Sequence, residues 1–190
     1  MFKRIIKGDF NYLSKKKARV IIMTVFLFAM SIGIFITGYV TTGTKKNLLT
    51  IVAVLGCLPA SKSAVSMIMF LRAKGCPLDI KEKIEPHTGK LVSMYDMYFT
   101  SYDANFPILH MIVNNKVVIG FYNDLKFDDS KCVKHLTTML ANAGYNNVTI
   151  SLTSDLNKYI NMLDNFNEKD ILDESVQDDE IRISLYEITL

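Results

Sequence analysis

Two long apolar segments, residues 20–40 and 48–71, constrain this chain more than any other feature of its sequence. The first contains no charged residue, and as a helix it would span about 31 Å, the thickness of a hydrocarbon core. The second would span about 36 Å, and a polar break at residues 41–47 separates the two. This pattern predicts a transmembrane helical hairpin with an external loop at 41–47. A cleaved signal peptide is the alternative for the first segment, but its apolar core would be unusually long and no A-x-A-like site follows it.

The two parts of the chain carry opposite charge. Residues 1–74 contain 12 Lys and Arg and one acid, Asp9, whereas residues 75–190 contain 10 Lys and Arg and 18 Asp and Glu. A basic part that contains the apolar segments and an acidic remainder are typical of a membrane anchor joined to a soluble domain. Because a surface that binds nucleic-acid phosphates should be basic, we expect no nucleic-acid partner.

The basic residues also predict the orientation of the hairpin. They cluster before the first segment and after the second, whereas the break between the segments carries only Lys45 and Lys46. The positive-inside rule therefore places both termini, and residues 75–190, in the cytoplasm. Together with a content of Ile, Lys, Asn, Tyr and Phe that favours an AT-rich bacterial genome, this indicates the plasma membrane of a bacterium.

Residues 1–19 form a basic cytoplasmic tail that also contains apolar residues, among them Phe2, Ile5 and Phe10. This mixture predicts a short amphipathic helix lying on a bilayer with an anionic inner leaflet. The alternative is a simple basic flank that only orients the hairpin.

The second apolar segment carries a semi-polar stripe. Pro59, Lys62, Ser63 and Ser66 follow one another at helical spacing, so they share one side of the rod. Burying a lysine at the bilayer centre costs roughly 2.5–3.5 kcal/mol on insertion scales, and neither segment contains an acid that would pair with Lys62. Two hypotheses follow: Lys62 contacts a partner subunit or an anionic ligand, or its side chain snorkels to the membrane surface.

Small residues recur at four-residue spacing in both segments, a pattern that lets helices approach closely in lipid. They are Ala29 and Gly33 in the first segment, and Gly56, Ala60 and Ala64 in the second. The spacing is consistent with packing of the two helices on each other, or with a face that forms a homo-oligomer or binds a membrane-protein partner.

Residues 75–190 predict a small α/β (α+β) domain with the order α-β-β-β-α-β-α-β. A three-strand meander is expected at residues 91–102, 107–113 and 116–122, because these runs are apolar and separated by turn residues. A helix beginning at Asp128, a strand at 147–152 and a helix after Ser154 continue the domain. We expect an acidic loop at 164–180 and a last strand at 181–190.

The order of helix, three-strand meander, helix and strand resembles the core of restriction-endonuclease-like nucleases. In that family an Asp and an acid-x-Lys pair on successive strands hold a divalent metal, and Asp96 matches the first position by its place. The third strand has no acid-x-Lys pair before Asp124-Leu125-Lys126, beyond the expected end of the strand. The resemblance therefore implies a degenerate domain of this fold with little or no activity, and it makes Asp96 and Asp124 pocket candidates.

No other motif names a reaction. The chain lacks nucleotide-binding glycine loops and the G-x-S-x-G elbow, and His87, His110 and His135 lack the spacing of metal ligands. We therefore predict no catalytic residue, no metal site and no cofactor. The function hypotheses are a non-enzymatic, membrane-tethered interaction or sensing module, a small subunit of a membrane complex that packs through its second helix, and the degenerate nuclease-like domain.

Overall fold

The computed structural model describes residues 6–102, 104–124, 126–168 and 176–190, and within them the protein is α+β with two compact units. Leu13–Ala73 form the hairpin unit, and the described residues before and after it form the globular unit. The hairpin unit contains α1 (Tyr12–Thr42) and α2 (Leu48–Arg72). The globular unit contains α3 (Leu78–Ile84), the 3₁₀ helix η1 (Glu85–His87), β1 (Ser93–Thr100), β2 (Asn105–Asn114), β3 (Val117–Phe121), α4 (Asp129–Asn142), β4 (Thr149–Thr153), α5 (Leu156–Glu168) and α6 (Val176–Ile188).

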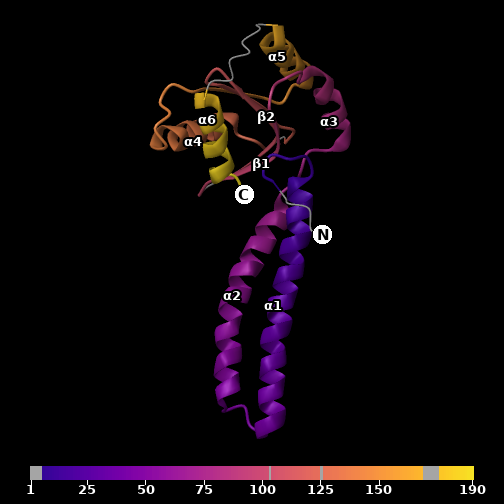
Figure 1. The fold of residues 1–190 in the computed structure, drawn as a ribbon, viewed down its shortest axis with the longest axis vertical. Helices are drawn as coiled ribbons and strands as arrows, with labels where there is room; N and C mark the ends of the chain where they lie inside the picture. The colour runs from indigo at the N-terminus through magenta and orange to yellow at the C-terminus, as the bar shows by residue number, and fades with distance from the viewer. Residues whose placement is uncertain (1–5, 103, 125, 169–175) are drawn as a thin grey trace. The chain divides into compact units, whose positions relative to one another are not determined.

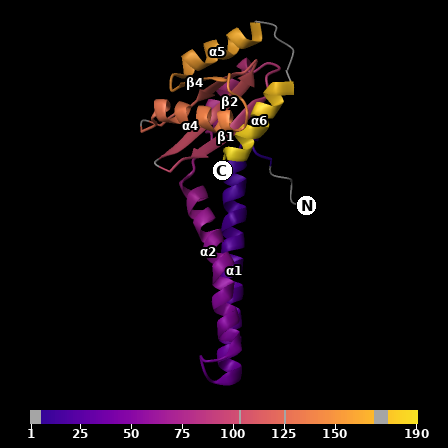
Figure 2. The same ribbon diagram turned by 90° about the vertical axis from the view of Figure 1, so that its left-hand side faces the viewer.

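Helices α1 and α2 pack antiparallel along their length in one register (Figures 1 and 2). Thr24 and Ser63 share a hydrogen bond of 2.7 Å between their hydroxyls, and a Cβ on Gly56 would lie 2.8 Å from Ser31 Oγ. At the loop end, a Cβ on Gly38 would lie 2.7 Å from Leu49 Cβ. These contacts repeat every seven residues, which is the spacing of helices that wind around each other.

Both helices are long and apolar enough to cross a membrane, and few of the residues in their apolar windows are buried. Asn47 organises the turn between them: its side chain accepts from Thr50 N at 2.8 Å and donates to Gly38 O at 2.9 Å. This arrangement caps α2 and satisfies a carbonyl near the end of α1.

The globular unit is built on a four-stranded mixed sheet in the order β1-β2-β3-β4. The first three strands form the expected antiparallel meander, and β4 pairs parallel with β3 after the crossover through α4. The two-residue turn between β2 and β3 is Asn115-Lys116, both with positive φ, which is the twist that favours a tight hairpin.

Two apolar cores cover the two faces of the sheet. Helices α4 and α6 pack on one face through Leu136, Leu140, Ile181 and Leu185. Helices α3 and α5 pack on the other, where Tyr159 and Leu163 are fully buried. Figure 1 shows α4 and α6 on one side of the strands and α3 and α5 on the other. The sheet is covered on both faces, which explains why its strands read as nearly continuous apolar runs.

The last segment differs from the sequence expectation. Residues 181–190 were expected to form a strand, but they belong mostly to α6. The apolar residues Ile181, Ile183 and Leu185 also fit alternation, yet Ile183 is exposed while the other two are buried. Asp178 at the start of the helix accepts from the backbone N–H groups of Asn115 and Lys116, both at 2.9 Å. These two hydrogen bonds fix the first turn of α6 against the β2–β3 turn.

Two further boundaries differ. The expected acidic loop at 164–180 is helical where it is described, in α5 up to Glu168 and in α6 from Val176, and residues 169–175 lie outside the described part. The expected surface helix at 1–19 is replaced by a non-helical segment at residues 6–11, followed by α1 from Tyr12; residues 1–5 lie outside the described part.

Candidate functional site

Two neighbouring residues of β1 hold the chain segments that lead into and out of the hairpin unit. Tyr95 N donates a 2.7 Å hydrogen bond to Gly8 O, four residues before α1 begins. Cys76 N, four residues after α2 ends, donates a 2.6 Å hydrogen bond to Asp96 Oδ1. Both segments belong to the globular unit, so the chain before α1 and the chain after α2 meet at neighbouring residues of β1, an edge strand of the sheet. We call this arrangement the junction.

Asp96 adopts an unusual backbone conformation at the junction. Its φ is 57°, a left-handed value inside a strand. Among the amino acids, mainly Gly, Asn and Asp adopt this left-handed region without a large steric cost. Met94 and Met97 both face the α4–α6 core, so Tyr95 and Asp96 between them both turn toward the α3–α5 side. Gly75 packs against the carboxylate, because a Cβ there would lie 3.0 Å from Asp96 Oδ1. The strained backbone therefore serves to place the carboxylate beneath the segment that follows α2.

The segment before α1 is held by four further contacts. Lys7 Nζ donates to Tyr186 O at 2.8 Å and to Thr189 O at 2.7 Å, the carbonyls at the end of α6. The Phe10 ring meets Tyr95 edge-on at 5.8 Å, and Lys81 Nζ lies 5.2 Å from the centre of the Phe10 ring. Cationic groups suit the carbonyl end of a helix and the face of an aromatic ring.

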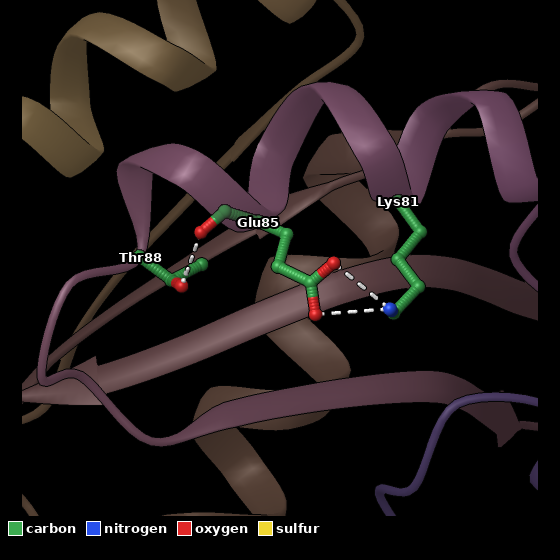
Figure 3. Close-up of polar contacts among 3 residues, drawn as sticks. All are labelled: Lys81, Glu85 and Thr88. Carbon is green, nitrogen blue, oxygen red and sulfur yellow. Dashed lines mark hydrogen bonds and ion pairs between the residues drawn. The ribbon is translucent and has the colours of Figure 1, made fainter.

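Lys81 is itself oriented by Glu85, the first residue of η1. Its Nζ donates to both carboxylate oxygens of Glu85 at 2.9 Å, and Thr88 Oγ1 donates to Glu85 O at 2.8 Å (Figure 3). Through the contact between Lys81 and Phe10, α3 and η1 join the segment before α1, so residues 7–10 and 78–88 form one structural region.

A buried polar pair lies behind the junction. His110, opposite Tyr95 in the β1–β2 register, has its Nδ1 2.7 Å from Tyr159 OH, and its ring lies 4.5 Å from that of Tyr95. His110 Nε2 has no hydrogen-bond partner within the described residues. Burial lowers the pKa of His110 to about 3, so the imidazole is neutral at physiological pH. Burial also raises the pKa of Cys76 to about 12, which keeps this thiol protonated and unreactive.

An open cavity of about 430 Å³ lies beside the junction. Its apolar wall is Pro107 and Leu109 of β2, and the neighbours of Leu109 pair with β1, Ile108 with Met97 and His110 with Tyr95. Its polar lining is Lys74, Asn123, Asp124 and Lys126. The last three follow the end of β3, the edge of a sheet at which open α/β folds bind ligands.

The structure separates the two pocket candidates that the nuclease resemblance suggested. Asp124 lines the cavity, and its Oδ1 accepts from Lys126 N at 3.0 Å. Asp96 is buried in the junction and does not line this cavity. Within the described part of the chain, no group of three or more His, Cys, Asp or Glu is placed to hold a metal ion.

The stripe of the second helix divides between two surroundings. Pro59 and Lys62 are exposed on the hairpin unit. Ser63 is half-buried, and its hydroxyl shares a hydrogen bond with that of Thr24 on α1. Ser66 is half-buried and its hydroxyl donates to Lys62 O at 3.3 Å, within α2.

The small residues divide in the same way. Ala60 is fully buried, Gly56 and Ala64 are half-buried, and Gly56 meets Ser31 of α1. Ala29 and Gly33 are exposed, and a Cβ on Gly33 would meet nothing within 4 Å. The contact surface of α1 instead uses Thr24, Ser31 and Gly38.

Sequence reasoning missed the junction residues Gly8, Lys7 and Tyr95, as well as Lys74. No local signal in the sequence pairs Gly8 with a strand nearly ninety residues later. The positive φ of Asp96 was also not predictable from the sequence, because Asp is common in turns and at the ends of strands, and its presence does not indicate a positive φ within a strand.

The chain matches no protein-family model, and no curated protein sequence or solved structure is significantly similar to it. The resemblance to restriction-endonuclease-like nucleases therefore rests on the order of the elements expected from the sequence alone.

Proposed function

We propose that this chain is a membrane-anchored, non-enzymatic module whose globular domain binds a partner or senses a condition close to the inner leaflet. One observation carries the proposal: most of the exposed large apolar side chains lie on α1 and α2, between Ile22 and Leu71. An apolar surface of this extent, on helices of 31 and 25 residues, suits lipid rather than water.

The distribution of basic residues supports a cytoplasmic domain. Lys15, Lys16, Lys17 and Arg19 lie in the first turns of α1, and Arg72 ends α2. Residues of this kind remain on the cytoplasmic side during insertion. Both ends of the hairpin then lie at the same leaflet. The junction requires this, because it holds the segment before α1 and the segment after α2 on the same strand.

The register of the hairpin favours the snorkelling hypothesis for Lys62. Within α2 alone, Lys62 lies about 15 Å from Arg72 along the helix axis. The Thr24–Ser63 hydrogen bond, however, sets Lys62 level with Val25, only about 7.5 Å beyond Val20, where the uncharged apolar segment of α1 begins. The exposed Lys62 side chain then needs to span only this shorter distance to place its ammonium group at the membrane surface. Its four-carbon stem spans most of it.

Alkaline extraction of membranes tests the anchor, with two lysine variants that test the depth. The protein should stay in the membrane pellet, and so should Lys62→Leu. Leu55 is exposed and, by the same register, level with Ile32 near the middle of α1. A lysine there cannot reach either surface, so Leu55→Lys should reduce the inserted fraction. Release of the wild-type protein into the supernatant would refute the anchor, and equal insertion of both lysine positions would refute the depth assignment.

A second candidate function is a subunit of a larger membrane complex. It is favoured by the exposed Pro59 and Lys62 on α2, and by the exposed Ala29 and Gly33 on α1. Gentle detergent extraction followed by mass spectrometry tests it. A stoichiometric membrane protein that is retained by the wild-type chain and lost from Lys62→Leu would favour this candidate; purification of the chain alone would oppose it.

A further inference from the structure

The cavity beside the junction brings together two cationic side chains from distant parts of the chain. Lys74 comes from the connection between α2 and α3, and Lys126 from the segment after β3. The cavity is open to solvent at the residues that carry charge, because Lys74, Asp124 and Lys126 are all exposed. Leu109 at its wall is buried, so the cavity has an apolar base.

The backbone near both lysines is fastened. On one side, Cys76 N donates to the buried Asp96 carboxylate, and Gly75 packs on the same carboxylate, so the chain is fixed within two residues of Lys74. On the other side, Lys126 N donates to Asp124 Oδ1 in a local turn. A site whose backbone is held before binding loses less entropy when a ligand arrives.

The charges of the lining select the class of ligand. Two lysines face one aspartate, and that carboxylate already accepts a backbone hydrogen bond. Asn123 adds an amide that donates hydrogen bonds. Lysine ammonium groups bind phosphate as compact point charges. We propose that this cavity binds a phosphate group through Lys74 and Lys126, with the remainder of the ligand against Pro107 and Leu109.

Two sources would supply this chemistry, a phospholipid headgroup or a soluble phosphate ester. The lipid source rests on the proposed membrane anchor. Lys74 lies two residues beyond Arg72, the end of α2, so at most about 7 Å of chain separates them. If α2 ends at the inner leaflet, Lys74 lies at the level of the headgroups, where basic residues attract anionic lipid.

The test uses full-length protein in maltoside micelles, which contain no phosphate, at constant ionic strength. Glycerol 3-phosphate is the soluble probe; phosphatidylglycerol added to the micelles is the lipid probe, with phosphatidylcholine as its uncharged counterpart. Amide hydrogen exchange is followed in peptides covering residues 72–78 and 120–128, next to the cavity. Lys74→Gln and Lys126→Gln each remove one cavity charge, and Lys134→Gln removes an exposed charge on α4 as the matched control.

Binding should slow exchange in both peptides, and each cavity variant should weaken the apparent affinity about tenfold, as expected for a lost charged hydrogen bond. Lys134→Gln should change it less than twofold. Protection by glycerol 3-phosphate assigns a soluble ester, and protection by phosphatidylglycerol alone assigns a lipid headgroup. Absence of protection by either probe, or equal losses in the control variant, would overturn the proposal. Because binding of the soluble probe does not depend on membrane insertion, the proposed phosphate site and the proposed membrane anchor are tested independently.

Discussion

Asp96 joins backbone strain to a buried hydrogen bond in a single residue. Its left-handed φ and its bond to Cys76 N hold the segment that leaves α2. Asp96→Ala should destabilise the protein by about 2–3 kcal/mol, because alanine tolerates this φ poorly and leaves the Cys76 N–H unpaired. Asp96→Asn should cost less than about half as much, because asparagine accepts both the conformation and the hydrogen bond.

Urea unfolding of the full-length protein in maltoside micelles measures both Asp96 variants. Tyrosine fluorescence reports the transition, since the chain contains nine tyrosines and no tryptophan. Equal stability of the alanine variant and the wild type would show that the junction contributes nothing.

His110 should make the stability of the domain depend on pH. Burial lowers its pKa in the folded state to about 3, below the ordinary value of 6.5. The stability that neutral His110 contributes is therefore complete above pH 6.5 and is lost as pH falls toward 3, because only the unfolded chain takes up the proton. Between pH 7 and pH 5 the loss from this residue should be about 2 kcal/mol.

The matched variant is His110→Gln, which keeps a polar group near Tyr159 but does not titrate. The free energy of unfolding is measured at both pH values for both proteins, so that all other titrating groups cancel in the difference. An equal loss in the variant would show that His110 is not buried in its neutral form.

The residue scale is where sequence reasoning was weakest. Asp96 and Asp124 were both recognised as notable acids, but their partners depend on contacts between β1, the connection after α2 and the end of β3. Such contacts join positions far apart in the chain and leave no local pattern. Lys62 is a further example, because its depth follows from the register of two helices and not from its place within one.

At the scale of elements, α6 offers a direct test of helix against strand. Ile181 and Ile183 are chemically identical, but only Ile181 is buried. Ile181→Ala should cost about 2–4 kcal/mol, whereas Ile183→Ala should change stability by less than about 0.5 kcal/mol. In a strand the two residues would share one face, so comparable losses for both variants in the same unfolding assay would contradict the helix.

The hairpin contains a similar matched pair of glycines. A side chain on Gly56 would collide with Ser31, whereas one on Gly33 meets nothing within 4 Å. Gly56→Leu should therefore separate α1 from α2 and lower the thermal unfolding temperature in micelles, and Gly33→Leu should leave it unchanged or raise it, since leucine is also the better helix former. If Gly33→Leu were the more damaging change, the register of the hairpin would be wrong.

Elements with a strong local signal were predictable. The meander, the α4 helix after Asp128 and the strand β4 follow from apolar runs and capping residues, and Asp128 indeed accepts from Lys131 N at 3.0 Å. The parallel pairing of β4 with β3 was not predicted. The last segment was not, because Ile181, Ile183 and Leu185 alternate as in a strand, while Ile181 and Leu185 are also spaced as on one face of a helix. The acids at 178–180 in the first turn were the signal that favoured a helix.

At the scale of the whole molecule, the central claim is that α1 and α2 cross a membrane and leave the globular domain in the cytoplasm. The sequence predicted the hairpin because residues 20–40 and 48–71 are predominantly apolar and long enough to span a hydrocarbon core. It did not predict that the chain segments before α1 and after α2 would both be fastened to β1. If only one of the two helices crossed the membrane, these segments would lie on opposite sides of it, and the junction could not form.

Cysteine labelling in intact cells tests this claim most directly. Thr44→Cys places a thiol in the connection between α1 and α2, and Tyr102→Cys places one on a fully exposed residue of the domain, whereas Cys76 and Cys132 are buried. A membrane-impermeant maleimide should label Thr44→Cys in intact cells and Tyr102→Cys only after lysis, relative to the wild-type chain. Labelling of Tyr102→Cys in intact cells, or protection of both sites until lysis, would contradict the account.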